Sequence, residues 1–169
     1  MIDADFVRMM ARYNSWQNRQ VTEALKDVPD ADLQADRGAF FGSIMATINH
    51  LLWGDTLWMS RFTPKVAPPR VPAAKHKVLT PTFSVWSAER FQMDGAIELW
   101  ARKVKSFELL GDLSWYSDMN KQQMRQPFAL CVVQFFNHQT HHRGQVHAMM
   151  TSLGLDAPVS DLAFMPKEA

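Results

Sequence analysis

The most informative stretch of the sequence is Phe136-Asn137-His138-Gln139-Thr140-His141-His142-Arg143-Gly144-Gln145. It lies within a run from about Phe128 to Leu153 that we predict to be one helix, because Pro127 precedes the run and Gly154 follows it. Residues four apart on a helix point the same way, so His138 and His142 can offer two imidazoles to one metal ion. The pair alone is not decisive, since histidines also occupy helix surfaces and hydrogen-bonded core positions.

A third ligand has to come from another part of the chain. Metalloproteases with this spacing carry glutamate directly after the first histidine as general base, and this chain has Gln139 there, which argues against a zincin-type peptidase. At about 100° per residue, His147 falls on the opposite side of the helix and His141 at the edge of the site face. The face of His138 and His142 is also expected to carry Cys131, Phe135, Gln145 and Met149.

A second helix is predicted from Ser43, as N-cap, to just before Pro64, and it contains Thr47-Ile48-Asn49-His50-Leu51-Leu52-Trp53-Gly54-Asp55. A lone histidine on such a face is more often a hydrogen-bonded core residue than a ligand. However, Gly54 lies one turn after His50, where it costs roughly 1 kcal/mol of helix propensity but leaves room above the histidine. We therefore expect His50 to complete a triad with His138 and His142, and three neutral imidazoles with an open position suit zinc, nickel or iron(II).

The remaining pattern predicts an all-α protein, a four-helix bundle in a single domain spanning residues 1–169. Two further helices are expected, one over about 4–28 that Pro29 stops and one over about 84–110 that Gly111 stops, with Val85 and Phe107 facing inward. From Pro64 to Pro81 the chain has five of its nine prolines, which indicates a long, ordered or semi-ordered crossover between the helix that begins at Ser43 and the helix over about 84–110. Alternation at Leu113, Trp115 and Ser117 is compatible with a short hairpin, and the tail from residue 157 is expected to be a docked turn with a loose end.

Composition excludes several classes of function. Eighteen basic and seventeen acidic residues leave a net charge of +1, which gives no electrostatic footprint for nucleic acid or anionic membranes. No apolar run approaches the roughly 20 residues needed to span a bilayer. The single Cys131 cannot form an internal disulfide, and the N-terminal residues lack the features of a secretory signal, so a soluble cytoplasmic protein is expected.

Three blocks taken together closely resemble the DinB/YfiT-like family, the damage-inducible bundle proteins that are distinct from the DNA polymerase sharing the name. They are Tyr13-Asn14-Ser15-Trp16-Gln17-Asn18 and the two histidine-bearing stretches quoted above. By that resemblance the metal ligands are His50, His138 and His142, whereas His76, His141 and His147 match no ligand position. The resemblance also implies a homodimer, as does an abundance of Trp, Phe and Met beyond what one small bundle needs to bury.

The resemblance implies a metal-dependent enzyme, in the first instance a thiol-dependent S-transferase acting on a small molecule with a low-molecular-weight thiol. The alternatives are a metal-dependent hydrolase and a non-catalytic metal-binding stress-response protein, because all three need the same triad. An open coordination position would favour an enzyme, and a fourth protein ligand would favour a structural role.

Four residues near the proposed ligands have other expected roles. Cys131 lies roughly 10 Å along the helix axis from His138, so we expect a packed core thiol rather than a ligand. Asp55 should point away from the ligands and pair with an arginine or a buried tyrosine hydroxyl. Trp53 and Phe135, each three residues from a proposed ligand, are candidate walls of a substrate pocket.

Overall fold

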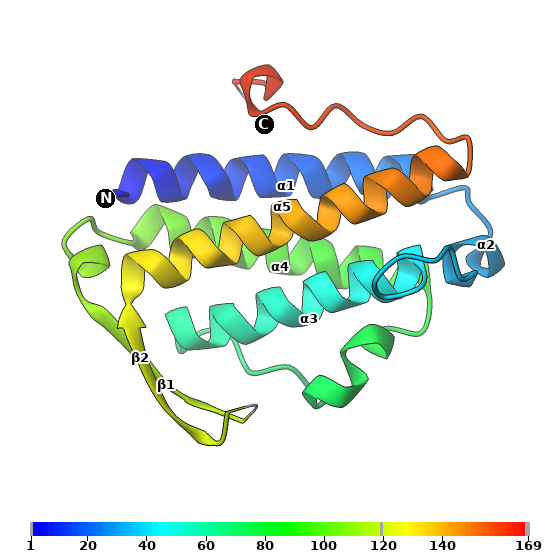
Figure 1. Cartoon of the computed structure of the whole chain (residues 1–169). Coiled ribbons are helices and arrows are strands. Elements are labelled where there is room, and N and C mark those ends of the chain that lie inside the picture. The colour runs from blue at the N-terminus through cyan, green and yellow to red at the C-terminus, as the bar shows by residue number, and fades with distance from the viewer. Residues whose placement is uncertain (1, 119, 168–169) are drawn as a thin grey trace.

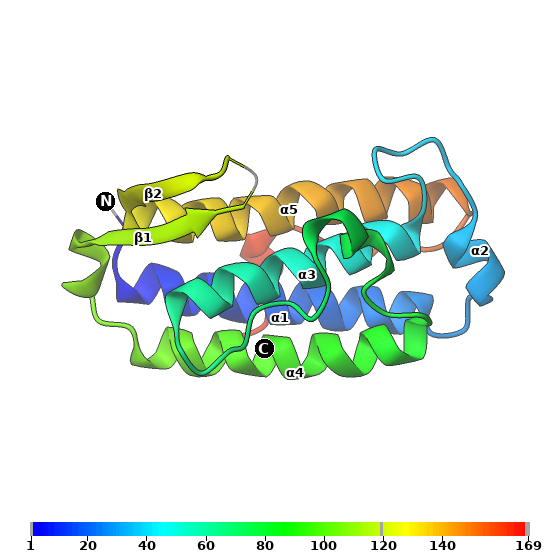
Figure 2. The ribbon, with the colours of Figure 1, turned by 90° about the horizontal axis from the view of Figure 1, so that it is seen from below.

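The computed structural model describes residues 2–118 and 120–167, and these form a mostly helical molecule (Figure 1). Its frame is four long helices: α1 (Ala4–Leu25), α3 (Ile44–Phe62), α4 (Phe83–Lys103) and α5 (Phe128–Ser152). α1 lies against α4 and α5, and α3 lies against α4 and α5 (Figures 1 and 2). No helix among the described residues combines the length and the apolar character needed to cross a membrane.

The long helices begin where the sequence supplies a polar cap or a proline. The side chains of Asp3, Ser43 and Thr82 each accept a hydrogen bond from a backbone N–H in the first turn of α1, α3 and α4. Pro127 directly precedes α5, which confirms the predicted start of that helix. Shorter helical segments occupy the connections: α2 (Asp30–Gln34), η1 (Ala73–Val78), η2 (Glu108–Leu110) and η3 (Leu162–Phe164).

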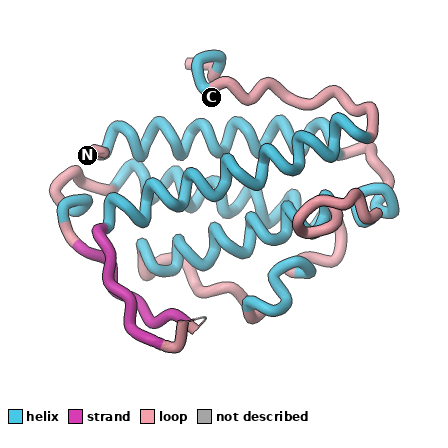
Figure 3. Tube along the Cα trace, in the orientation of Figure 1, coloured by secondary structure: helices cyan, strands magenta, loops and turns pink. Residues whose placement is uncertain are grey.

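The prediction of an all-α fold is confirmed in part, because the mostly helical molecule also contains a small two-stranded sheet. An antiparallel hairpin of β1 (Asp112–Ser117) and β2 (Gln122–Pro127) projects beside the start of α5 (Figure 3, magenta). β1 is the stretch where alternation was noted, and its Trp115 ring packs 5.6 Å from the ring of Trp58. β2 reads Gln-Gln-Met-Arg-Gln-Pro, and this polar composition gave no apolar alternation to detect.

The prediction that the helix over about 84–110 continues to residue 110 was wrong. α4 ends at Lys103, and Val104 leaves the helical conformation (φ −58°, ψ 137°) with its side chain buried. The chain then turns so that the Ser106 hydroxyl accepts a hydrogen bond from the backbone N–H of Ala4. Phe107, expected to face inward along a continuous helix, is therefore 73% exposed, and Val85 near the start of α4 is also exposed.

The proline-rich crossover between α3 and α4 is ordered. Its short helix η1 packs against α3 (Figure 2). The tail after α5 returns along α1, where Tyr13 Oη donates to the carbonyl of Ser160 and Gln17 Nε2 to that of Val159. The tail is thus docked as predicted, although its last residues, 168–169, lie outside the described part of the chain.

Candidate metal centre

α3 and α5 bring the three predicted histidines together. His50 comes from α3, and His138 and His142 come from successive turns of α5. One ring nitrogen from each lies within 4.8 Å of the other two, and the Nε2 atoms of His50 and His138 are 2.9 Å apart. The rings stand edge to face, with centroids 4.5 Å apart for His138 and His142 and 4.6 Å apart for His50 and His142. The cluster can therefore direct three nitrogens at one point.

Gly54 makes this approach possible, although its role differs slightly from the one expected from the sequence. A Cβ atom at position 54 would lie 3.0 Å from Cε1 of His138, closer than an ordinary contact. The space left by the glycine is thus filled by the His138 ring from α5 and not kept free above His50. The reason is that α5 packs directly on this face of α3.

The outer nitrogens of two of these histidines also have partners. His142 Nδ1 lies 2.7 Å from Gln145 Oε1, one turn further along α5. His50 Nδ1 lies 2.9 Å from Nδ1 of His76, which belongs to η1 in the crossover. His76 was expected to match no ligand position; the structure places it beside the cluster, against the nitrogen of His50 that faces away from His138.

Aromatic side chains surround the histidines. The Phe41 ring, in the loop before α3, lies 4.2 Å from the His50 ring and 5.2 Å from that of His142. The Trp53 ring lies 6.1 Å from the ring of His76, and its role as a wall of a substrate pocket stays a prediction. Phe135 was a wrong choice, because it is fully buried in the apolar core against Phe62 and Phe136. Phe41 has no periodic signal in the sequence, since it is a loop residue placed by tertiary packing.

Burial keeps the cluster neutral. Desolvation, followed by the neighbouring histidines, lowers the pKa of His50 from 6.5 to about 3. Desolvation is also the main cause that lowers the pKa of His76, His138 and His142; for His138 the Asp55 carboxylate opposes it, and for His142 the hydrogen bond with Gln145 does. Neutral imidazoles have a lone pair to give, so the electrostatics of the cluster suit metal ligation at neutral pH.

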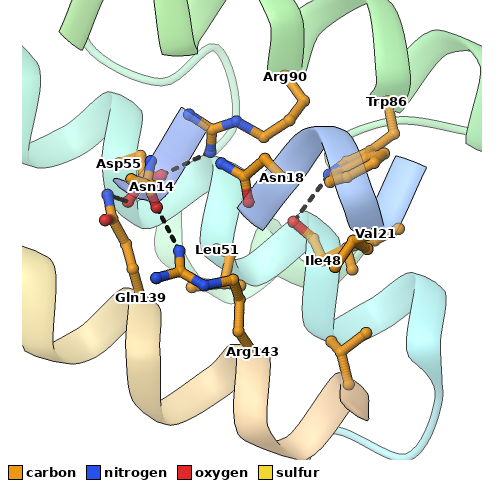
Figure 4. Close-up of a pocket in the computed structure, with 11 residues that line it drawn as sticks. Asn14, Asn18, Val21, Ile48, Leu51, Asp55, Trp86, Arg90, Gln139 and Arg143 are labelled. Atoms are coloured by element: carbon orange, nitrogen blue, oxygen red, sulfur yellow. Dashed lines mark hydrogen bonds and ion pairs between the residues drawn. The ribbon is translucent and has the colours of Figure 1, made fainter. Parts of the chain in front are cut away.

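A buried polar network connects α1, α3, α4 and α5 (Figure 4). Asp55 receives a hydrogen bond of 2.9 Å from Gln139, the neighbour of His138, and forms a 2.5 Å ion pair with Arg90 of α4.

The same network extends from Arg90 to α1. Arg90 also pairs with Asp94 at 2.9 Å, and Asp94 accepts hydrogen bonds from Asn14 and Asn18 of α1. Arg143 donates to Asn14, which closes the network between α5 and α1. The expected pairing of Asp55 with an arginine is thus confirmed.

Of the remaining candidates, Cys131 and His147 do not belong to the cluster, whereas the His141 ring lies 4.8 Å from the ring of His142. Cys131 is buried, and burial raises the pKa of its thiol, as expected for a packed core cysteine. His141 is exposed, and its Nε2 lies 3.4 Å from Nε2 of Gln145. His147 lines a hollow of about 330 Å³ between α1 and α5 together with Tyr13 and Arg143. His147 thus faces this hollow and is not part of the histidine group.

Fold and site together define a mostly helical protein in which two neighbouring helices present three neutral imidazoles that could hold a metal ion. The chain belongs to the DinB family, whose sequence profile matches residues 1–169. It is also similar to Protein DinB of Bacillus subtilis (strain 168), with 23% identity over 159 residues that cover 94% of this chain and 92% of that relative. The family resemblance read from the three sequence blocks is confirmed.

Proposed function

We propose that this protein is a metal-dependent enzyme whose divalent ion is held by His50, His138 and His142 within a four-helix bundle. The observation that carries the proposal is the convergence of three neutral imidazoles from α3 and α5, with ligand atoms within 4.8 Å of one another. Among the described residues this group of His, Cys, Asp and Glu donors has three members. Three protein ligands are typical of sites that keep a coordination position for water or substrate.

The donor set fits zinc, nickel or iron(II). All three ions accept imidazole nitrogen, and the uncharged ligands leave the positive charge of a bound ion undiminished. Such an ion favours an anion as its next ligand, and a thiolate meets that need. We therefore propose a thiol-dependent S-transferase that takes a low-molecular-weight thiol and a small-molecule acceptor as substrates.

In this reaction the protein would bind the metal ion and orient its ligands. When bound, the ion would supply Lewis acidity that lowers the pKa of a thiol and favours the nucleophilic thiolate. The three imidazoles are already grouped, so little rearrangement is needed to ligate it. The Phe41 ring packs against the rings of His50 and His142 and so places an apolar surface beside the cluster.

The proposal is tested by adding a low-molecular-weight thiol to the cobalt-substituted protein. We expect a sulfur-to-metal charge-transfer band that is missing from His50→Ala, His138→Ala and His142→Ala. A spectrum unchanged by any thiol, together with metal-dependent hydrolysis of an ester or amide, would replace the transferase with a hydrolase that activates water. An unchanged spectrum without hydrolysis would leave a non-catalytic metal-binding protein.

We also propose that two copies of the chain associate in the cytoplasm. Apolar side chains on the surface of α4 support this, since Phe91 is 75% exposed and Leu99 is 57% exposed. The buried, unpaired thiol of Cys131 is compatible with a reducing compartment. Light scattering at micromolar concentration should give the mass of a dimer, and a monomer mass would contradict the association.

A further inference from the structure

Each imidazole in the cluster has two ring nitrogens, and only one of them can face a shared ion. For His50 the two nitrogens have different neighbours: Nε2 lies 2.9 Å from Nε2 of His138, and Nδ1 lies 2.9 Å from Nδ1 of His76. For His142, Nδ1 lies 2.7 Å from Gln145 Oε1. In both rings Nδ1 is therefore engaged by a residue outside the triad.

We propose that His76 and Gln145 are positioning residues that fix the tautomers of His50 and His142 for ligation through Nε2. The inference rests on the proposed metal site, and it assigns roles to two residues that are not themselves ligands. The partner of the outer nitrogen generally decides which nitrogen of a ligating histidine carries the proton and how the ring is oriented.

The proton positions follow from the chemistry of the partners. An imidazole that binds an ion through Nε2 carries its proton on Nδ1, so His50 Nδ1–H must donate to His76 Nδ1. His76 is then neutral, with its own proton on Nε2. The opposite direction, with His76 donating to His50, would put the His50 proton on Nε2 and block the nitrogen that faces His138.

The proton position of His142 is more tightly determined than that of His50, because the Oε1 atom of Gln145 can only accept a hydrogen bond. His142 Nδ1 must therefore be the donor in their 2.7 Å contact. The other end of the same amide supports this orientation, since Gln145 Nε2 faces Nε2 of His141 at 3.4 Å. The Nε2 atom of His142 is consequently unprotonated, with a free lone pair, even before a metal is added.

The position of His76 is held by the fold. Asn49, the neighbour of His50 on α3, donates through Nδ2 to the carbonyls of Lys77 and Thr80, each at 3.2 Å, and accepts from the Thr80 N–H at 3.0 Å. Trp53 Nε1 binds the carbonyl of Val71 at 2.9 Å. The crossover is thus fastened to α3 on both sides of His76, and the same helix residues that flank His50 determine where the His76 ring lies.

The first test is zinc affinity, measured by competition with a chelator. His76→Ala and Gln145→Ala should each weaken binding by about 10–100-fold, the usual effect of losing an outer partner. His76→Gln should recover part of the affinity, because an amide oxygen can accept from His50, whereas His76→Phe should not. Gln145→Glu should bind more tightly than the wild type, because a carboxylate is a stronger acceptor.

The matched control is His147→Ala, which removes a histidine of α5 outside the cluster and should keep wild-type affinity. Thermal melts of each variant identify any that do not fold. If His76→Ala abolished stoichiometric binding, His76 would be a fourth ligand and the positioning role would be wrong. Affinity within twofold of wild type in both His76→Ala and Gln145→Ala would also overturn the proposal.

The second test is the nitrogen-15 spectrum of the histidine rings, which reports tautomers directly. In zinc-loaded protein His50 and His142 should both carry the proton on Nδ1, and ligation of His50 through Nδ1 would contradict the proposal while leaving the metal site intact. In metal-free protein His142 should already be the Nδ1–H form. The metal-free spectrum can be interpreted even if the wild type binds no zinc, a result that would refute the proposed function. In the metal-free protein, an Nε2–H form of His142 would overturn the role of Gln145.

Discussion

At the scale of single residues, Gly54 controls how closely α5 approaches the face of α3 that carries His50. A Cβ atom at this position would lie 3.0 Å from Cε1 of His138, so a side chain must push the ring outward by a few tenths of an ångström. His138 Nε2 lies only 2.9 Å from His50 Nε2. A displacement of that ring therefore changes the arrangement of the candidate ligands themselves.

We predict that Gly54→Ala lowers metal affinity at least several-fold, while Gly95→Ala leaves it unchanged. Gly95 lies in α4, where a Cβ atom would meet no described atom within 4 Å, so alanine should stabilise the protein there by roughly 0.5–1 kcal/mol through helix propensity. Metal titration and thermal denaturation of the two variants measure these effects. Equal affinity of Gly54→Ala and wild type would show that His138 does not depend on the glycine.

The sequence could predict the three histidines but not what surrounds them. The four-residue spacing identifies His138 and His142 because both lie on one helix, and Gly54 singled out His50 through a local pattern. Phe41 and His76 lie in connecting segments and reach the site only through tertiary packing. No periodicity marks residues of this kind, which is why neither could be assigned to the site from the sequence.

At the scale of secondary-structure elements, Asp55 of α3 connects the ligand-bearing helices to α4. Its carboxylate binds Arg90 of α4 on one side and Gln139 of α5 on the other, and all three side chains are almost fully buried. A buried charge that loses its partner is costly because water cannot replace the lost interaction. The network therefore stabilises one relative placement of the helices that carry the histidines.

We predict that Arg90→Met destabilises the protein by about 3–5 kcal/mol, because it leaves the buried carboxylates Asp55 and Asp94 without their cation. The control on the same helix is Arg102→Met, which removes an ion pair with Glu98 whose arginine side chain is 69% exposed and should cost at most about 1 kcal/mol. Urea denaturation of both variants gives the comparison. Similar losses for the two would mean that the buried network does not fasten the helices.

Element boundaries were predictable where a single residue sets them. Ser43 and Pro127 were read correctly as the starts of α3 and α5, because a cap or a proline acts locally. The end of α4 could not be predicted, because apolar residues continue past Lys103 with helical spacing. Val104 leaves the helix to bury its side chain, and Ser106 contacts the start of α1, a contact no local pattern encodes.

At the scale of the whole molecule, the grouped histidines should make the stability of the metal-free protein depend on pH. In the unfolded chain a histidine has a pKa near 6.5, whereas burial lowers the pKa of His50 in the folded protein to about 3. Between these values the unfolded state binds a proton that the folded state does not. Stability contributed by this group is therefore present above pH 6.5 and is lost as the pH falls toward 3.

We predict that His50→Gln loses less stability than wild type between about pH 7.5 and pH 5 in the absence of metal. Comparing the two proteins is necessary because burial raises the pKa of Asp94 to about 6, which acts in the opposite direction by favouring the folded state at lower pH. Urea midpoints at the two pH values measure the difference. If the stability of His50→Gln and of the wild type fell equally between the two pH values, protonation of His50 would not destabilise the folded protein and the prediction would be wrong.

Metal analysis of protein purified without a polyhistidine tag shows whether His50, His138 and His142 hold one divalent ion. The wild type and His147→Ala should each retain about one equivalent of metal per chain. His50→Ala, His138→Ala and His142→Ala should each retain almost none, because two remaining imidazoles are too few to hold the ion. A full equivalent in any of these three variants would remove that residue from the triad, and a metal-free wild type that takes up no zinc, nickel or iron(II) would show that the three histidines do not form a metal site.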